Sequence, residues 1–63
     1  MKFDLKTWRT SKGLTVKEAA NKLEISEYTL MNYESGKTFP SVPVIKRMEK
    51  LYNTTYDNIL FLP

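Results

Sequence analysis

The 63-residue sequence contains no cysteine and no histidine. Without cysteine it can form neither disulfides nor thiolate metal sites. Without histidine it lacks the commonest zinc ligand and the usual general base near neutral pH. A Ser/His/Asp or Cys/His catalytic set is therefore excluded, and the two glycines form no phosphate-cradling loop. We expect no enzymatic activity, no metal, no cofactor and no small-molecule substrate.

Long apolar runs are missing as well. No stretch approaches the roughly 18 apolar residues of a membrane span. The N-terminus, MKFDLKTW, lacks the apolar core of a secretory signal. We therefore expect a cytoplasmic protein without a membrane partner. The length allows a single domain, residues 1–63, and a domain of this size buries only about 60% of its unfolded surface, so its stability is marginal.

Acidic residues are fewer than basic ones. Ten Lys and Arg stand against seven Asp and Glu, which gives a net charge of +3. This balance suits a polyanionic partner, although a mildly basic charge is common among small proteins. Hydrophobic residues make up 41% and charged residues 27% of the chain. These values are typical of a globular domain rather than of a disordered segment.

Apolar spacing predicts five short helices and no strand. The first helix is expected over residues 2–12, where Leu5 and Trp8 lie on one face. The second begins after Thr15, because Thr15 and Glu18 have the spacing of a capping box, which satisfies two otherwise unpaired backbone donors. The last two helices are predicted after caps at Ser41 and Thr55, the final one covering residues 56–61.

The third predicted helix follows a tight turn at residues 24–26. Ser26 is its expected cap and Gly36 its end. Leu30 and Tyr33 are expected to face the interior, which leaves a polar outer face. A short polar-faced helix held by another helix is a device for entering a DNA groove.

The sequence then matches a known pattern, most specifically in the block YESGK. The matching positions are Leu5, Trp8, Arg9, Gly13, Leu14, Thr15, Glu18, Ala20, Leu23, Ser26, Leu30, Tyr33, Glu34, Ser35, Gly36, Lys37, Pro40, Ser41, Thr55 and Asp57. At these spacings the chain resembles the Cro/C1-type helix-turn-helix family, which includes phage repressors. The resemblance implies an all-α, compact five-helix lambda-repressor-like domain that binds DNA as a homodimer on a two-fold-symmetric operator.

Three positions depart from the family pattern. Val16 stands where the family often has a glutamine that clamps a phosphate, so that contact is lost or passes to Lys17. Glu24 stands where a glycine with positive φ is common, at a cost of roughly 1 kcal/mol. Ala19 replaces a usual leucine, and the bulkier Trp8 is expected to fill the gap.

The candidate base-reading residues are Glu27, Tyr28, Thr29 and Asn32. Asn can bond bidentately to adenine, Glu can accept from a cytosine amino group, and Thr or an aromatic ring can pack on a thymine methyl. Two other interpretations remain open: Glu27 could simply suit the helix dipole, and Tyr28 could be a partly buried anchor. Met31 lies between the faces and could contact a sugar or another subunit.

The candidate phosphate-binding residues lie at the start of the second helix and after the third. They are Lys17, Asn21, Ser35, Gly36, Lys37 and Thr38. Any one lysine is more often a solvated surface charge, but phosphate contacts act together. The resemblance implies that Arg9 and Glu34 form a structural ion pair between the first and third helices. The aromatic residues Trp8, Tyr33, Phe39 and Tyr52 are expected in the core or at its rim.

The apolar run at residues 59–63 supplies more surface than the core needs. We expect Ile59 and Leu60 to close the core, and Phe61 and Leu62 to contact a second subunit. The leading functional hypothesis is a transcriptional regulator, expected to be a repressor, that binds double-stranded DNA. The alternative is a protein-interaction module, antitoxin-like or anti-repressor, on the same scaffold with weak or no DNA binding.

Overall fold

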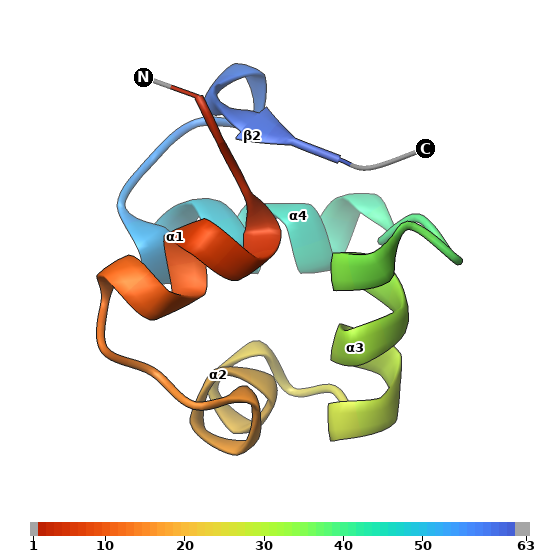
Figure 1. The fold of residues 1–63 in the computed structure, drawn as a ribbon. Coiled ribbons are helices and arrows are strands. Elements are labelled where there is room, and N and C mark those ends of the chain that lie inside the picture. The colour runs from red at the N-terminus through yellow and green to blue at the C-terminus, as the bar shows by residue number, and fades with distance from the viewer. Residues whose placement is uncertain (1, 62–63) are drawn as a thin grey trace.

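The computed structural model describes residues 2–61, which form four α-helices and a short two-stranded sheet (Figure 1). Helix α3 lies at one edge of the molecule, and α2 lies on the side away from the sheet (Figure 1). The elements in chain order are β1 (Phe3–Asp4), α1 (Leu5–Ser11), α2 (Val16–Leu23), α3 (Glu27–Ser35), α4 (Val42–Tyr52), the 3₁₀ helix η1 (Tyr56–Asn58) and β2 (Ile59–Leu60).

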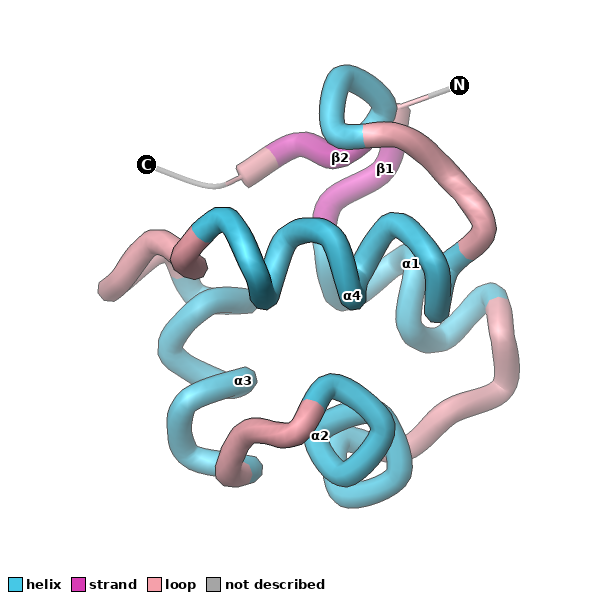
Figure 2. The backbone as a smooth tube through the Cα atoms, turned by 180° about the vertical axis from the view of Figure 1, so that it is seen from behind, coloured by secondary structure: helices cyan, strands magenta, loops and turns pink. Residues whose placement is uncertain are grey.

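The two ends of the chain differ from the predicted all-α, five-helix fold. Phe3 pairs with Ile59 in a parallel sheet, and Figure 2 shows β1 and β2 side by side. The first helix starts at residue 5, because the Asp4 carboxylate accepts the Thr7 amide at 2.8 Å and caps it there. The fifth helix, expected over residues 56–61, is a 3₁₀ helix over residues 56–58 only, and β2 and one further residue follow it.

The short strand at the C-terminal end also decides which apolar residues are buried. Ile59 is 5% exposed and Leu60 is 48% exposed, because neighbouring side chains on a strand point to opposite faces. The expectation that both residues close the core is therefore wrong for Leu60. The Trp8 indole donates to the Asn58 carbonyl at 3.0 Å and ties α1 to the same segment.

The caps of the central helices form as the sequence predicts. The Glu18 amide donates to Thr15 Oγ1 at 3.1 Å, and the Thr15 amide donates to Glu18 Oε1 at 2.9 Å. Hydrogen bonding of Thr15 to the charged carboxylate, chiefly from its backbone amide, lowers the pKa of Glu18. Ser26 Oγ accepts the Thr29 amide at 3.0 Å at the start of α3. Ser41 and Thr55 hold N-cap positions without a side-chain cap bond.

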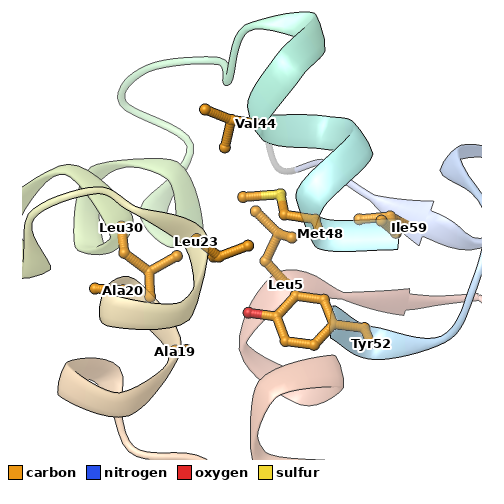
Figure 3. Close-up of a cluster of buried hydrophobic side chains, with 9 residues drawn as sticks. All are labelled: Leu5, Ala19, Ala20, Leu23, Leu30, Val44, Met48, Tyr52 and Ile59. Atoms are coloured by element: carbon orange, nitrogen blue, oxygen red, sulfur yellow. The ribbon is translucent and has the colours of Figure 1, made fainter. Parts of the chain in front are cut away.

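The core draws side chains from all four helices and from β2 (Figure 3). Ala19 and Ala20 are 0% and 2% exposed, so their small side chains let the neighbouring elements approach α2 closely. Trp8 is half-buried and packs against this core. That it compensates for Ala19 stays a prediction. The core consists of Leu5, Ala19, Ala20, Leu23, Leu30, Val44, Met48, Tyr52 and Ile59.

Arg9 and Glu34 form the ion pair that the resemblance implies. Arg9 Nε lies 2.8 Å from Glu34 Oε2, and Nη2 lies 3.3 Å from Oε1. Arg9 Nη1 also donates to the Leu14 carbonyl at 3.0 Å. Both side chains are only 9% exposed. One guanidinium therefore joins three segments: α1, α3 and the loop that precedes α2. The hydrogen bond to Glu34 raises the pKa of Arg9.

Replacing Glu34 with alanine leaves the Arg9 cation buried and uncompensated. We expect Glu34→Ala to lower the free energy of unfolding by about 3 kcal/mol, which in a domain of this size lowers the melting temperature by more than about 10 °C. Thermal unfolding followed by circular dichroism measures the change. As a control, Glu27→Ala removes an exposed carboxylate from the same helix and should cost less than about 1 kcal/mol. A Glu34→Ala variant that melts like the parent chain but prefers a different duplex contradicts the structural role.

Tyr52 has a buried hydroxyl without a hydrogen-bond partner among the described residues. Burial raises its pKa from 10.0 to about 12. Below pH 10 the hydroxyl is protonated in both the folded and the unfolded chain. As the pH rises above 10, the unfolded chain loses this proton first, and folding loses stability.

We expect a Tyr52→Phe variant to be at least as stable as the parent chain at pH 7, because it removes an unpaired buried hydroxyl without changing the ring. Between pH 9 and pH 11 the parent chain should lose about 1 kcal/mol relative to the variant. Urea unfolding of both chains at each pH measures this difference, and the lysines titrate equally in the two. If both chains lost the same free energy of unfolding between pH 9 and pH 11, Tyr52 would not titrate as described.

Candidate nucleic-acid interface

Helices α2 and α3 are joined by a turn that the backbone closes tightly. Glu24 takes the left-handed conformation with φ 61°, as expected at a position where the family often has glycine. The Ile25 amide donates to the Ala20 carbonyl at 3.0 Å, and Ile25 packs partly buried against the core. From α4, Arg47 Nε donates to the Leu23 carbonyl at 2.8 Å and holds the end of α2. These contacts set the angle between α2 and α3.

Helix α3 is anchored by its inner face and leaves its outer face open. Leu30 is fully buried, and Tyr33 packs against the core. In the two opposite views, no other described helix or strand lies beyond α3 on its outer side (Figures 1 and 2). The outer face is therefore available to a partner.

The four predicted base-reading residues all lie outside the buried core. Glu27 is exposed, Tyr28 is 73% exposed, and Thr29 and Asn32 are half-buried. The high exposure of Tyr28 rules out the interpretation in which it is a partly buried anchor. Met31, which the sequence placed between the two faces, is 56% exposed. The spacing of these residues brings Tyr28, Met31 and Asn32 to neighbouring positions on the helix surface.

Thr29 differs from the other three because its polar groups already have partners. Ser26 Oγ donates to Thr29 Oγ1 at 2.8 Å, and the Thr29 amide donates back to Ser26 Oγ. The hydroxyl therefore belongs to the helix cap, and its methyl group is the part best suited to a base contact. Its base-reading role stays a prediction.

Two predicted phosphate-binding residues on α2 lie beside the start of α3. Lys17 and Asn21 are exposed and line an open hollow of about 590 Å³ together with Ser26 and Glu27. The structure thus brings a candidate phosphate contact and a candidate base contact to one depression between the two helices. Glu18 lines the same hollow, so Lys17 would offset only part of the repulsion between the two carboxylates and a DNA backbone.

The predicted phosphate loop at residues 35–38 uses its backbone donors to close α3. The amides of Lys37 and Thr38 donate to the Asn32 carbonyl at 3.0 and 3.4 Å, and the Gly36 amide donates to the Tyr33 carbonyl at 3.3 Å. Gly36 has φ 82°, the left-handed conformation that ends the helix. The side chains of Lys37 and Thr38 are exposed, so phosphate contacts here would come from side chains.

The last predicted phosphate contact, Ser35, is exposed, and its hydroxyl donates to the Asn32 carbonyl at 3.2 Å.

Within residues 2–61 no group of three or more acidic side chains could hold a metal ion. In the same part of the chain, no helix has the length and apolar character needed to cross a membrane.

Comparisons with known proteins support a helix-turn-helix domain. A family model described as a helix-turn-helix domain matches residues 4–59. The HTH-type transcriptional regulator ImmR of Bacillus subtilis is 39% identical over 56 residues, which cover 89% of this chain and 44% of ImmR. The HTH-type transcriptional activator BcrR of Enterococcus faecalis is 34% identical over 56 residues, which cover 89% of this chain and 28% of BcrR.

The aligned region is thus less than half of either relative. No solved structure matches the chain significantly. The family match nevertheless spans α1 to the start of β2 and includes every candidate interface residue. The chain therefore belongs to the helix-turn-helix domain family, of the Cro/C1-like kind that these relatives represent.

Proposed function

We propose that this chain is a sequence-specific regulator of transcription that binds double-stranded DNA with α3 in the major groove. The observation that carries the proposal is the open outer face of α3, held in place by the Arg9–Glu34 ion pair and by the closed turn after α2. The names of the two relatives, one a transcriptional regulator and one an activator, support a role in transcription.

We further propose that the chain represses by occluding a promoter. Repression of this kind needs only a domain that occupies the DNA, whereas activation needs an additional contact with the transcription machinery. In this scheme the phosphate contacts supply most of the affinity, and the side chains of α3 supply the specificity. That residues 1–63 form one DNA-binding domain, which acts without a catalytic step, is part of the proposal.

Salt dependence tests the phosphate contacts. We expect the chain to bind random duplex at low salt and to lose affinity steeply as salt rises, because each neutralised phosphate releases counterions. Lys17→Gln and Lys37→Gln should each reduce the slope of log K against log salt by about 0.9. Lys50→Gln, an equal charge change on α4, is the control and should leave the slope unchanged. Gel-shift titrations at several salt concentrations measure these slopes.

Two outcomes would contradict the proposal. Absence of binding to any duplex at low salt would favour the protein-interaction module, which the apolar surface described next also suits. Equal reductions of the slope by the α4 control and by the two interface variants would show that affinity comes from overall charge. In either case the interface on α2 and α3 would lose its support.

A second surface suits a homodimer. Phe39 and Val42 are 59% and 65% exposed, so Phe39 does not lie in the core or at its rim as expected. The ring centroids of Phe39 and Phe61 are 4.8 Å apart, and those of Tyr56 and Phe61 are 5.4 Å apart. We call Phe39, Val42, Tyr56 and Phe61 the aromatic patch. Leu62, the other residue expected at a subunit contact, lies outside the described residues.

We propose that the aromatic patch binds a second copy of the chain around a two-fold axis. Three patch residues line an open hollow of about 380 Å³, which Lys46 and Glu49 also line. In a two-fold arrangement a surface meets itself, so a border with one positive and one negative side chain can pair with its own copy. Two copies would present their α3 helices to half-sites about 34 Å apart.

A charge placed in the aromatic patch tests this interface. We expect Val42→Glu to weaken self-association at least tenfold, because a carboxylate in an apolar contact must be desolvated. The fold should survive, since an acidic residue suits the first turn of α4. Thr7→Glu, the same charge change at an exposed position of α1, is the control. Analytical ultracentrifugation measures the dissociation constants. Equal self-association of the parent chain and both variants would place the interface elsewhere.

A further inference from the structure

The outer face of α3 has no positive charge. Residues 27–35, EYTLMNYES, contain neither lysine nor arginine. Of the two carboxylates in this helix, that of Glu34 is held by Arg9, and that of Glu27 is exposed. Lysine and arginine are the side chains that bond bidentately to guanine O6 and N7, the commonest base-specific contact in the major groove. Helix α3 therefore lacks the side chains that bond bidentately to guanine.

The same face carries two large apolar side chains. Tyr28 is 73% exposed and Met31 is 56% exposed. They are three residues apart, so they are neighbours on the helix surface. The core side of α3 is already occupied by Leu30 and Tyr33. Met31 borders an open hollow with Lys6 and Val16, yet both it and Tyr28 keep more than half of their surface exposed. The main apolar group that a base presents in the major groove is the C5-methyl of thymine.

Asn32 completes the set, because it follows Tyr28 by one helical turn. Its amide side chain can bond bidentately to adenine N6 and N7, which no other major-groove base edge matches as well. Glu27, at the first turn, can only accept, and the exocyclic amino group of cytosine suits it. The cations of the interface, Lys17 and Lys37, lie before and after α3 rather than on it. Adenine and thymine are thus the bases that the centre of this helix can read.

We propose that α3 selects half-sites whose base pairs opposite its centre are A·T, with Asn32 on an adenine and Tyr28 and Met31 against thymine methyl groups. Glu27 allows a single cytosine at one end of the half-site. This inference rests on the proposed binding of α3 in the major groove, and it specifies the class of DNA sequence that the groove must present.

The test removes the methyl groups alone. Preferred duplexes are first selected from a random pool, and the best duplex is then remade with deoxyuridine in place of thymidine, which keeps base pairing but deletes every C5-methyl. We expect the selected half-sites to be A·T at their centre. The chain should bind the deoxyuridine duplex about tenfold more weakly, the loss expected for two buried methyl groups.

Variants assign the effect to α3. Met31→Gln and Tyr28→Ser remove apolar side chains from exposed positions, so both should fold, which thermal unfolding checks. Each should reduce the ratio between the thymidine and deoxyuridine affinities by about threefold. Lys37→Gln is the control, because it should weaken both duplexes equally and leave the ratio unchanged.

Three results would overturn the inference. Selected half-sites with G·C pairs at their centre, equal affinity for the two duplexes, or an unchanged ratio in both α3 variants would each show that α3 does not read thymine methyl groups. These results differ from failure of the proposed function, in which no duplex is bound at low salt.

Discussion

The Arg9–Glu34 ion pair is the contact on which the arrangement of this domain depends. The pair joins α1 to α3. Arg9 also donates a hydrogen bond to the Leu14 carbonyl, which ties the loop before α2 to the same guanidinium. A buried pair of this kind adds less to stability than to geometry, because desolvation of the two charges offsets much of their attraction. Its consequence here is that α3 has one position relative to α1 and α2. A helix that reads bases needs such a position, because base-edge hydrogen bonds tolerate little displacement.

The core of this domain is small, so contacts made by the two chain ends help to complete it. The strands β1 and β2 pair in parallel, and the Trp8 indole bonds to the carbonyl just before β2. These contacts bring Ile59 into the core and close the side of the molecule opposite α2 (Figure 1). The N-terminal and C-terminal segments therefore support one another, and both support α1, which carries Arg9. Helix α1 thus contacts both the C-terminal segment and α3.

The two proposed roles of this domain use separate parts of its surface. The side of α3 facing away from the core carries polar and apolar groups that suit a DNA groove, and the aromatic patch gathers side chains from the loop after α3, the start of α4 and the C-terminal segment. Of the patch residues, Phe39 lies in the loop that directly follows α3 along the chain. A dimer formed through the patch would hold two copies of α3 in a defined relation, which is the requirement for reading a symmetric operator.

Local features were determined by the sequence alone. The capping box at Thr15, the cap at Ser26 and the end of α3 at Gly36 depend on neighbouring residues, so spacing was enough to predict them. The resemblance supplied the Arg9–Glu34 pair and the positive φ of Glu24. Only the tertiary structure decided that the two chain ends form strands. A two-residue strand has no periodicity, and it forms only when a partner lies alongside it, as Ile59 does for Phe3, 56 residues away. The tertiary structure also decided that Phe39 and Leu60 are exposed and that the amides after α3 are already bonded, because burial and hydrogen bonding depend on neighbours that the local sequence does not contain.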